Sequence, residues 1–198
     1  SVKNLIRRLA VQSMFMKQRS ASGIGNVQQI VMNFVLTGNP GTGKTSVSRL
    51  MGELLQSMDI LPTKKVIETS RATMVGKYMG ETPKLVNKLC DQALGGVLFI
   101  DEAYNICNGD DQYGKEAVDT LMKRMEDDRG KFVVIVAGYK DRMEMFLNTN
   151  PGLASRFTHR LHIDDYNEDE LVSIFKKMAA KQDYELSQDA EFKLMGEV

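Results

Sequence analysis

The sequence predicts an α/β fold of three layers, in which helices cover both faces of a central parallel sheet. Short runs of apolar and β-branched residues alternate along the chain with longer segments of helical periodicity, the pattern of strands joined by helical crossovers. One run, Val97–Ile100, is wholly apolar, as expected for a parallel strand covered on both faces. At 198 residues the chain is long enough to bury a core.

The first expected unit is a strand, a loop and a helix. Val31–Thr37 is rich in β-forming residues and ends in the Gly-Pro-Gly turn chemistry of Gly38–Gly43, which indicates a strand followed by a loop. Residues 44–58 repeat apolar side chains at helical spacing and predict a helix. A second strand is expected at 65–68.

The middle of the chain repeats this alternation. Pro83 suits the first turn of a helix expected over 82–93, and Gly95 with Gly96 ends it before the strand Val97–Ile100. The further elements expected are a helix at 115–126, a strand at 132–137, a short helix at 142–147 and a strand at 159–163.

Two segments stand outside the alternating pattern. Asn167 and Glu170 form a plausible capping pair for a helix over 168–181, another helix is expected near Ser187, and no strand separates them. We therefore expect an α/β domain over residues 1–165 and the beginning of a C-terminal helical lid over 166–198. Leu5, Ile6, Leu9 and Ala10 predict an N-terminal amphipathic helix, packed on its own domain or acting as a basic surface-binding helix.

Composition narrows the classes of partner. Lysine plus arginine (26) equals aspartate plus glutamate (26), so no net charge attracts the chain to nucleic acid or to an anionic membrane. Basic residues interrupt the apolar N-terminal segment, which excludes a signal peptide or a membrane span there. Cys90 and Cys107 form no Cys-x-x-Cys pair, and a reducing, cytoplasmic location is expected.

A phosphate-binding motif lies between the first strand and the first helix. Residues 38–45 fit G-x-x-x-x-G-K-T in the strand–loop–helix context that the motif requires. Backbone N–H groups of such a loop surround phosphates at a helix N-terminus. Lys44 would hold the β and γ phosphates, and the Thr45 hydroxyl would coordinate Mg²⁺. The residues expected to contact ATP or GTP are Gly38, Asn39, Pro40, Gly41, Thr42, Gly43, Lys44, Thr45 and Ser46.

A pair of carboxylates follows the apolar strand. Asp101 and Glu102 stand at its C-terminal end, where open α/β sheets bind their ligands. Asp101 can hold Mg²⁺ through water, and Glu102 can accept a proton from the water that attacks the γ phosphate. The alternative is a cap for the following helix, but the upstream phosphate loop favours hydrolysis.

These motifs occur in a familiar order. The phosphate loop, Tyr78-Met79-Gly80, Leu-Phe-Ile-Asp-Glu-Ala-Tyr (98–104), Val-Ala-Gly-Tyr-Lys-Asp-Arg-Met (136–143) and Asn-Pro-Gly-Leu-Ala-Ser-Arg-Phe (150–157) resemble the AAA+ ATPases. In particular the chain resembles the CbbX/CfxQ and stage V sporulation protein K group. The resemblance covers nearly the whole chain and implies the P-loop NTPase fold, with ATP and Mg²⁺ as cofactors.

The resemblance also implies roles for residues outside the two motifs. Arg156 matches the arginine finger that reaches a neighbouring subunit's ATP, with a structural arginine as the alternative and Arg160 as a weaker candidate. Tyr78 and Met79 match the pore loop that grips a threaded polypeptide, although Tyr78 could instead pack on its own domain. Many members carry a polar sensor residue after the fourth strand, where this chain has Tyr139, followed by Asp141. Either residue could order the attacking water or simply close the turn after the strand, and both alternatives stay open.

The expected function is therefore Mg-ATP hydrolysis by a hexameric ring that remodels or partly threads a protein partner. The alternatives are an ATP-dependent assembly switch that threads nothing, and a nucleic-acid motor or clamp loader, which the zero net charge disfavours. The family's adenine contact is expected before Ser1 and its lid arginine beyond Val198, so we expect the chain to be truncated at both ends. The loop that carries Tyr78 is expected to be remote from the phosphates.

Overall fold

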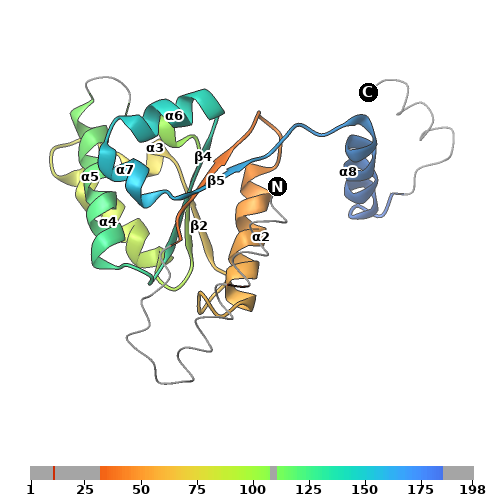
Figure 1. The fold of residues 1–198 in the computed structure, drawn as a ribbon, viewed down its shortest axis with the longest axis horizontal. Coiled ribbons are helices and arrows are strands. Elements are labelled where there is room, and N and C mark those ends of the chain that lie inside the picture. Colours follow the sequence, from red (N-terminus) through yellow and green to blue (C-terminus); the bar gives the residue numbers. More distant parts are fainter. Residues whose placement is uncertain (1–10, 12–31, 108–110, 185–198) are drawn as a thin grey trace. The chain divides into compact units, whose positions relative to one another are not determined.

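A five-stranded parallel sheet forms the centre of the computed structural model, which describes residues 11, 32–107 and 111–184. Its strands lie in the order β2-β3-β4-β1-β5, with every neighbouring pair parallel (Figure 1). The strands are β1 (Phe34–Thr37), β2 (Val66–Thr69), β3 (Val97–Ile100), β4 (Val133–Gly138) and β5 (His159–His162). The three-layer α/β prediction is confirmed for this unit.

Helices cover both faces of the sheet. The helical elements of this unit are α2 (Lys44–Ser57), α3 (Arg71–Met74), α4 (Glu81–Ala93), the 3₁₀ turn η1 (Ala103–Asn105), α5 (Gln112–Asp127), α6 (Lys140–Asn148) and α7 (Pro151–Arg156). In Figure 1, α2 lies on one side of the strands, and α4, α5, α6 and α7 lie on the other. The expected N-terminal helix lies outside the described residues, except for Val11.

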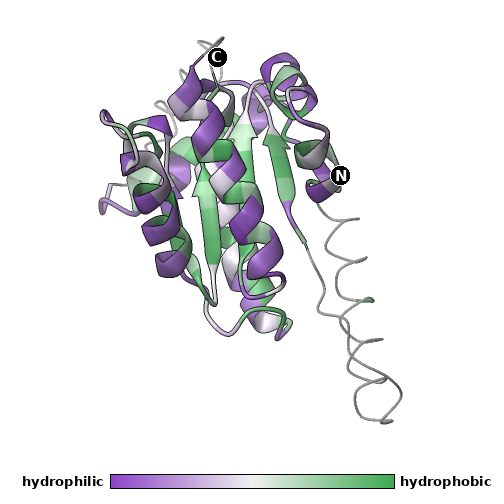
Figure 2. Ribbon diagram, turned by 90° about the vertical axis from the view of Figure 1, so that its left-hand side faces the viewer, coloured by the Kyte–Doolittle hydropathy of each residue, from purple (hydrophilic) through white to green (hydrophobic). Residues whose placement is uncertain are grey.

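Two hydrophobic clusters fill the spaces between the layers. Successive side chains of a strand point to opposite faces. Phe34 and Leu36 of β1 accordingly join the cluster that contains Met51 and Leu55 of α2, whereas Val35 joins the cluster under the other helices. Figure 2 shows apolar strands lying between helices whose outer faces are polar.

Three short helical elements were not predicted, and several boundaries differ. The elements α3, η1 and α7 span only 4, 3 and 6 residues, too few to reveal a helical period. β1 begins at Phe34 rather than Val31, and β5 ends at His162. α5 begins at Gln112, three residues earlier than predicted, because the Asp111 side chain accepts a capping hydrogen bond from the Tyr113 N–H.

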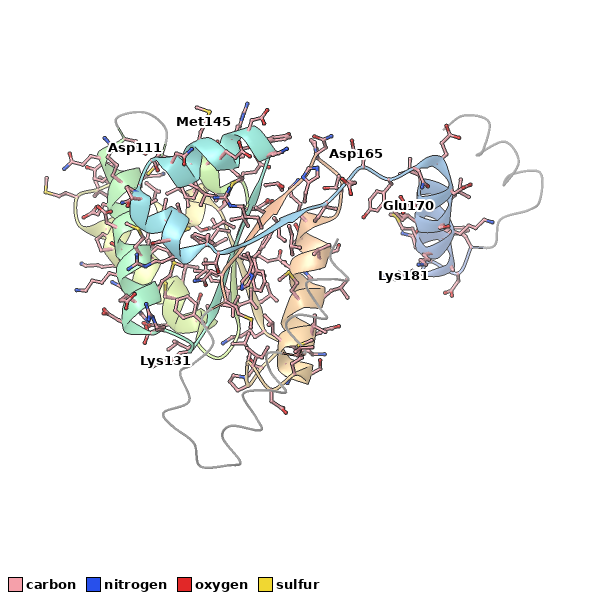
Figure 3. The ribbon with its side chains drawn as sticks, in the orientation of Figure 1. Asp111, Lys131, Met145, Asp165, Glu170 and Lys181 are labelled. Carbon is pink, nitrogen blue, oxygen red and sulfur yellow. The ribbon has the colours of Figure 1, made fainter. Side chains whose placement is uncertain are left out.

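A second compact unit comprises Asp164–Val198, of which residues 164–184 are described. It contains α8 (Glu168–Ala180), and Figure 3 labels Glu170 and Lys181 at its two ends. Asn167 and Glu170 form the expected capping box. The helix expected near Ser187 lies outside the described residues, and the lid assignment remains a prediction. Within the described parts of the chain, no helix is both long and apolar enough to cross a membrane.

Candidate active site

The loop between β1 and α2 has a backbone that only glycine accommodates at its bends. Gly41 (φ 77°) and Gly43 (φ 81°) are left-handed, a conformation that costs most other residues about 1 kcal/mol or more. Gly38 has a different constraint: a Cβ there would lie 2.7 Å from the Ile163 carbonyl oxygen. The glycines therefore allow this loop to turn tightly against the end of the sheet.

Lys44 is anchored inside this loop. Its side chain is nearly buried, and Nζ donates to the carbonyl oxygens of Gly38 (3.0 Å) and Asn39 (2.8 Å). Thr42 also donates to the Asn39 carbonyl, at 2.8 Å. A buried ammonium at the N-terminus of the 14-residue helix α2 adds to the positive end of the helix dipole, so the loop suits a phosphate chain. Thr45 is half-buried in the first turn of α2.

Four of the remaining motif residues, Asn39, Pro40, Gly41 and Ser46, are exposed, so their polar groups are accessible to a ligand. Thr42 is buried, and its hydroxyl is used within the loop.

Asp101 and Glu102 lie at the same edge of the sheet as the phosphate loop. Thr37, the last residue of β1, pairs with Gly138 of β4, while Ile100, the last residue of β3, pairs with Val136. The carboxyl ends of the three parallel strands are therefore nearly level. The predicted juxtaposition of loop and carboxylates at one edge follows from this register.

Glu102 has an unusual backbone conformation. Its φ of 49° is left-handed, which is uncommon for a residue other than glycine. Its N–H donates to Asp101 Oδ1 at 3.1 Å. Although Glu102 occupies the N-cap position of η1, its side chain makes no capping hydrogen bond there. The capping alternative therefore finds no support, and the carboxylate is left to face the site.

The surroundings of Glu102 shift its acidity. Burial and the neighbouring Asp101 charge raise the pKa of Glu102, while Lys44 and Arg142 oppose the shift. A carboxylate with a raised pKa is a stronger base than an ordinary surface glutamate. This direction suits proton acceptance from water.

An aromatic and cationic group lies beside this base; Tyr139 was a sequence candidate for ordering water, whereas Tyr104 and Arg142 were not assigned a role. The Arg142 guanidinium carbon is 5.1 Å from the Tyr104 ring centroid and 5.5 Å from that of Tyr139. Lys44 Nζ is 5.9 Å from the Tyr139 centroid, and such cation–aromatic contacts are attractive. The only sequence signal for Arg142 was its place in the motif at 136–143. A cavity of about 600 Å³ is lined by Glu102, Tyr104, Asn105, Tyr139, Asp141 and Arg142.

Arg71 fixes the turn that follows the carboxylates, and it too was missed. It donates through Nη1 to the carbonyl oxygens of Asn105 (3.1 Å) and Ile106 (2.6 Å). It also forms an ion pair with Asp111, which Figure 3 labels near the start of α5. These contacts join residues more than thirty positions apart in the chain, so no local pattern could indicate them.

Arg156 ends α7, with its side chain 29% exposed. Nη2 lies 3.4 Å from Glu126 Oε2, and Nη1 donates to the Gly152 carbonyl at 3.3 Å. Both distances are long for charge-assisted hydrogen bonds, which usually measure about 2.7–2.9 Å. Arg160 lies on β5 and is exposed. The structure brings neither arginine into the lining of the cavities beside Glu102.

Tyr78 and Met79 occupy the loop between α3 and α4, and their side chains are 75% and 92% exposed. Tyr78 therefore does not pack on its own domain, which was the alternative to a pore-loop role. The loop is less remote from the site than expected, however. Its first part shares a cavity of about 750 Å³ with the carboxylates, lined by Ser70, Arg71, Ala72, Val75, Gly76, Lys77, Asp101, Glu102 and Asn105.

Comparison with known proteins identifies the family. Residues 34–165 match the family model described as "ATPase family associated with various cellular activities (AAA)". The chain belongs to the AAA ATPase family. Stage V sporulation protein K of Bacillus subtilis is 44% identical over 91% of the chain, and CfxQ of Xanthobacter flavus is 40% identical over 96%. These AAA relatives confirm the resemblance to the CbbX/CfxQ group, and the chain spans 56% and 60% of their lengths.

A solved AAA structure supports the fold. The FIGL-1 AAA domain, solved in complex with ADP, matches with a TM-score of 0.60, covering 91% of this chain and 57% of that one at 19% sequence identity. At this identity the likeness concerns the fold alone. Membership of the AAA family makes this chain an ATPase domain that binds nucleotide.

The donor groups at the sheet edge are consistent with a magnesium ion that binds together with nucleotide. Among residues 32–107 and 111–184, no group of three or more histidine, cysteine or acidic side chains could hold a metal by itself. A hydroxyl from Thr45 and a carboxylate from Asp101 would leave most coordination positions of such an ion to phosphate oxygens and water. Mg²⁺ prefers this kind of oxygen set.

Proposed function

We propose that this AAA domain binds and hydrolyses Mg-ATP and couples hydrolysis to the remodelling of a protein partner. The observation that carries the proposal is the position of the phosphate loop and the carboxylates at the same edge of the sheet, where the strands before them end at nearly the same level. The loop with the exposed Tyr78 begins beside these carboxylates and shares a cavity with them. The proposed assembly is a homo-oligomeric, hexameric ring, as the family resemblance implies. The setting is cytoplasmic, and neither membrane nor nucleic acid is a proposed partner.

Each site residue has a proposed role. Lys44 neutralises charge on the β and γ phosphates, and Thr45 with Asp101 holds the Mg²⁺ ion, which supplies further charge neutralisation when bound. Glu102 accepts the proton of the attacking water. Its raised pKa supports this role.

Arg156 is proposed to act on the ATP of the adjacent subunit. The long contacts to Glu126 and Gly152 hold its guanidinium weakly within its own subunit, so that little is lost when it reaches a neighbour. A guanidinium at the γ phosphate stabilises the charge that develops during phosphoryl transfer.

The test of this role mixes two defective variants of the full-length protein. Arg156→Ala keeps its own pocket but lacks the finger, whereas Glu102→Gln keeps the finger but lacks the base. Each alone should lose most ATPase activity, and mixed rings should recover part of it. Arg129→Ala is the matched control, because Arg129 also pairs with Glu126, at 3.1 Å, and lies outside the proposed chemistry. Co-assembled rings with no recovered activity would count against Arg156 acting in trans.

Protein remodelling is tested at Tyr78. Tyr78→Ala removes an exposed ring worth on the order of 1–3 kcal/mol when it is buried against a polypeptide. Stimulation of ATP hydrolysis by the unfolded protein casein should be lost when every subunit of the ring lacks this side chain. Met145→Ala is the control, since Met145 is also exposed (71%) and projects from α6 (Figure 3). Full casein stimulation in the Tyr78→Ala ring would count against polypeptide binding by this loop and favour an assembly switch instead.

A further inference from the structure

The side chains of residues 77–79 are exposed to solvent, so contacts other than their packing must hold the segment 76–80. With Tyr78 and Met79 largely exposed, packing contributes little to its conformation. Fixing the backbone of each residue costs conformational entropy. The contacts that offset this cost are hydrogen bonds between the segment and the first residues of α4.

Two side chains at the start of α4 bind the backbone of this loop. The carboxylate oxygen Oε2 of Glu81 accepts from the N–H groups of Lys77 (2.8 Å) and Tyr78 (3.3 Å). Thr82 is fully buried, and its Oγ1 accepts from the Gly76 N–H at 3.0 Å. The Glu81 N–H donates in return to the Tyr78 carbonyl at 3.2 Å. One carboxylate and one hydroxyl thus engage three consecutive amides.

Glycine is required where this arrangement closes. A Cβ on Gly76 would lie 2.6 Å from the Cβ of Glu81, so the Glu81 side chain lies directly against that backbone. Gly80 has a left-handed backbone, with φ 75°, and is the N-cap of α4. The loop therefore leaves α3 beneath the Glu81 carboxylate and enters α4 through a glycine bend.

We propose that Glu81 is a positioning residue which, through the amides of Lys77 and Tyr78, holds Tyr78 and Met79 in a preformed projecting loop. The contribution of Glu81 to polypeptide binding rests on the function proposed above. A preformed loop loses less entropy when it meets a partner than a loop that must first become ordered. Loss of the Glu81 carboxylate should therefore weaken substrate binding rather than the chemistry.

The competing explanation is that Glu81 only stabilises α4. An acidic residue in the first turn interacts favourably with the helix dipole, and Glu81 is the first residue of α4. That role would change the stability of α4 but would not single out the amides of Lys77 and Tyr78. Residue-resolved hydrogen exchange distinguishes the two.

The first experiment measures amide exchange in this chain by NMR. A charge-assisted hydrogen bond is worth about 1.5–3 kcal/mol, so Glu81→Ala should speed exchange about tenfold or more at Lys77, whose bond measures 2.8 Å. Exchange at Tyr78, whose bond measures 3.3 Å, should rise by a smaller factor. Glu81→Gln keeps an oxygen acceptor and should retain part of the protection. Lys84→Ala, at an exposed position of the same first turn, should leave both rates unchanged. Wild-type exchange rates at both amides in Glu81→Ala would overturn the proposal, as would an equal rise along the whole of α4.

The second experiment uses casein-stimulated ATP hydrolysis by the full-length protein. Glu81→Ala should raise the casein concentration for half-maximal stimulation about tenfold and preserve the maximal stimulated rate, with Glu81→Gln in between. Unaltered casein dependence in Glu81→Ala, alongside its loss in Tyr78→Ala, would refute the positioning role and leave the proposed function standing. If Tyr78→Ala also keeps full stimulation, the proposed function itself fails, whatever the exchange rates are.

Discussion

Asn33 joins three parts of the sheet domain through one buried side chain. Its Oδ1 accepts from the N–H of Val134 on β4 at 2.9 Å, and its Nδ2 donates to the carbonyl of Arg156 at the end of α7, at 3.3 Å. Asn33 is only 4% exposed. Asn33→Ala would therefore leave one buried amide and one carbonyl without their partners.

The expected cost follows from the burial of these two groups. A buried polar group that loses its partner costs about 1–3 kcal/mol. The Val134 bond is buried and counts in full, whereas the Arg156 bond is only partly buried and counts for less. We expect Asn33→Ala to lower the free energy of unfolding by about 2–4 kcal/mol. For a domain of this size, that corresponds to a melting temperature about 5–12 °C lower.

Urea and thermal unfolding of the wild type and two variants test this figure. The control is Asn148→Ala, at an exposed position in the last turn of α6, for which a change within about 0.5 kcal/mol is expected. If Asn33→Ala is as mild as this control, the side chain does not bridge β4 and α7. The anchoring of Arg156 by Asn33 would then also be wrong.

Three further substitutions or modifications have definite expected outcomes. Lys44→Ala should remove detectable ATP binding in calorimetry with the unfolding curve retained, and undiminished affinity would refute the phosphate-loop assignment. Gly138→Ala places a Cβ 2.7 Å from the Tyr104 ring and should destabilise the domain by about 1–3 kcal/mol in urea; wild-type stability would mean that Tyr104 moves aside freely. Burial raises the pKa of Cys90 to about 11 and also raises the pKa of Cys107. Because Cys90 is fully buried and Cys107 only partly buried, an aromatic disulfide reagent at pH 8 should modify Cys107 first, and equal rates would contradict this.

Local signals predicted the order of the elements because each signal has a cause within a few residues. Val97–Ile100 is buried at every position, and a strand buried on both faces reads as an uninterrupted apolar run. Asn167 and Glu170 were readable as a capping pair because the two hydrogen bonds span three positions. The phosphate loop was readable because its left-handed positions Gly41 and Gly43 demand glycine.

The parts that could not be predicted depend on contacts between distant segments. Alternating strands and helices predict a parallel sheet, but they do not say that β1 lies between β4 and β5. Arg71 and Arg142 are unremarkable charged residues in the sequence. Their partners, the Ile106 carbonyl and the Tyr104 ring, are brought to them by the fold. The same holds for Asn33, whose partners on β4 and at the end of α7 are brought to it by the fold.

The backbone of Glu102 shows why the site and its surroundings must be considered together. A left-handed glutamate costs of order 1–3 kcal/mol, and such a conformation persists only where neighbouring structure enforces it. Here β2 fixes the chain before Glu102, because the Asp101 N–H donates to the carbonyl of Thr69, the last residue of β2, at 2.9 Å. Arg71 fixes the chain after it by holding the Asn105 carbonyl. Hydrogen bonds on both sides of Glu102 therefore sustain its strained backbone. In this conformation Glu102 lines both cavities at the sheet edge.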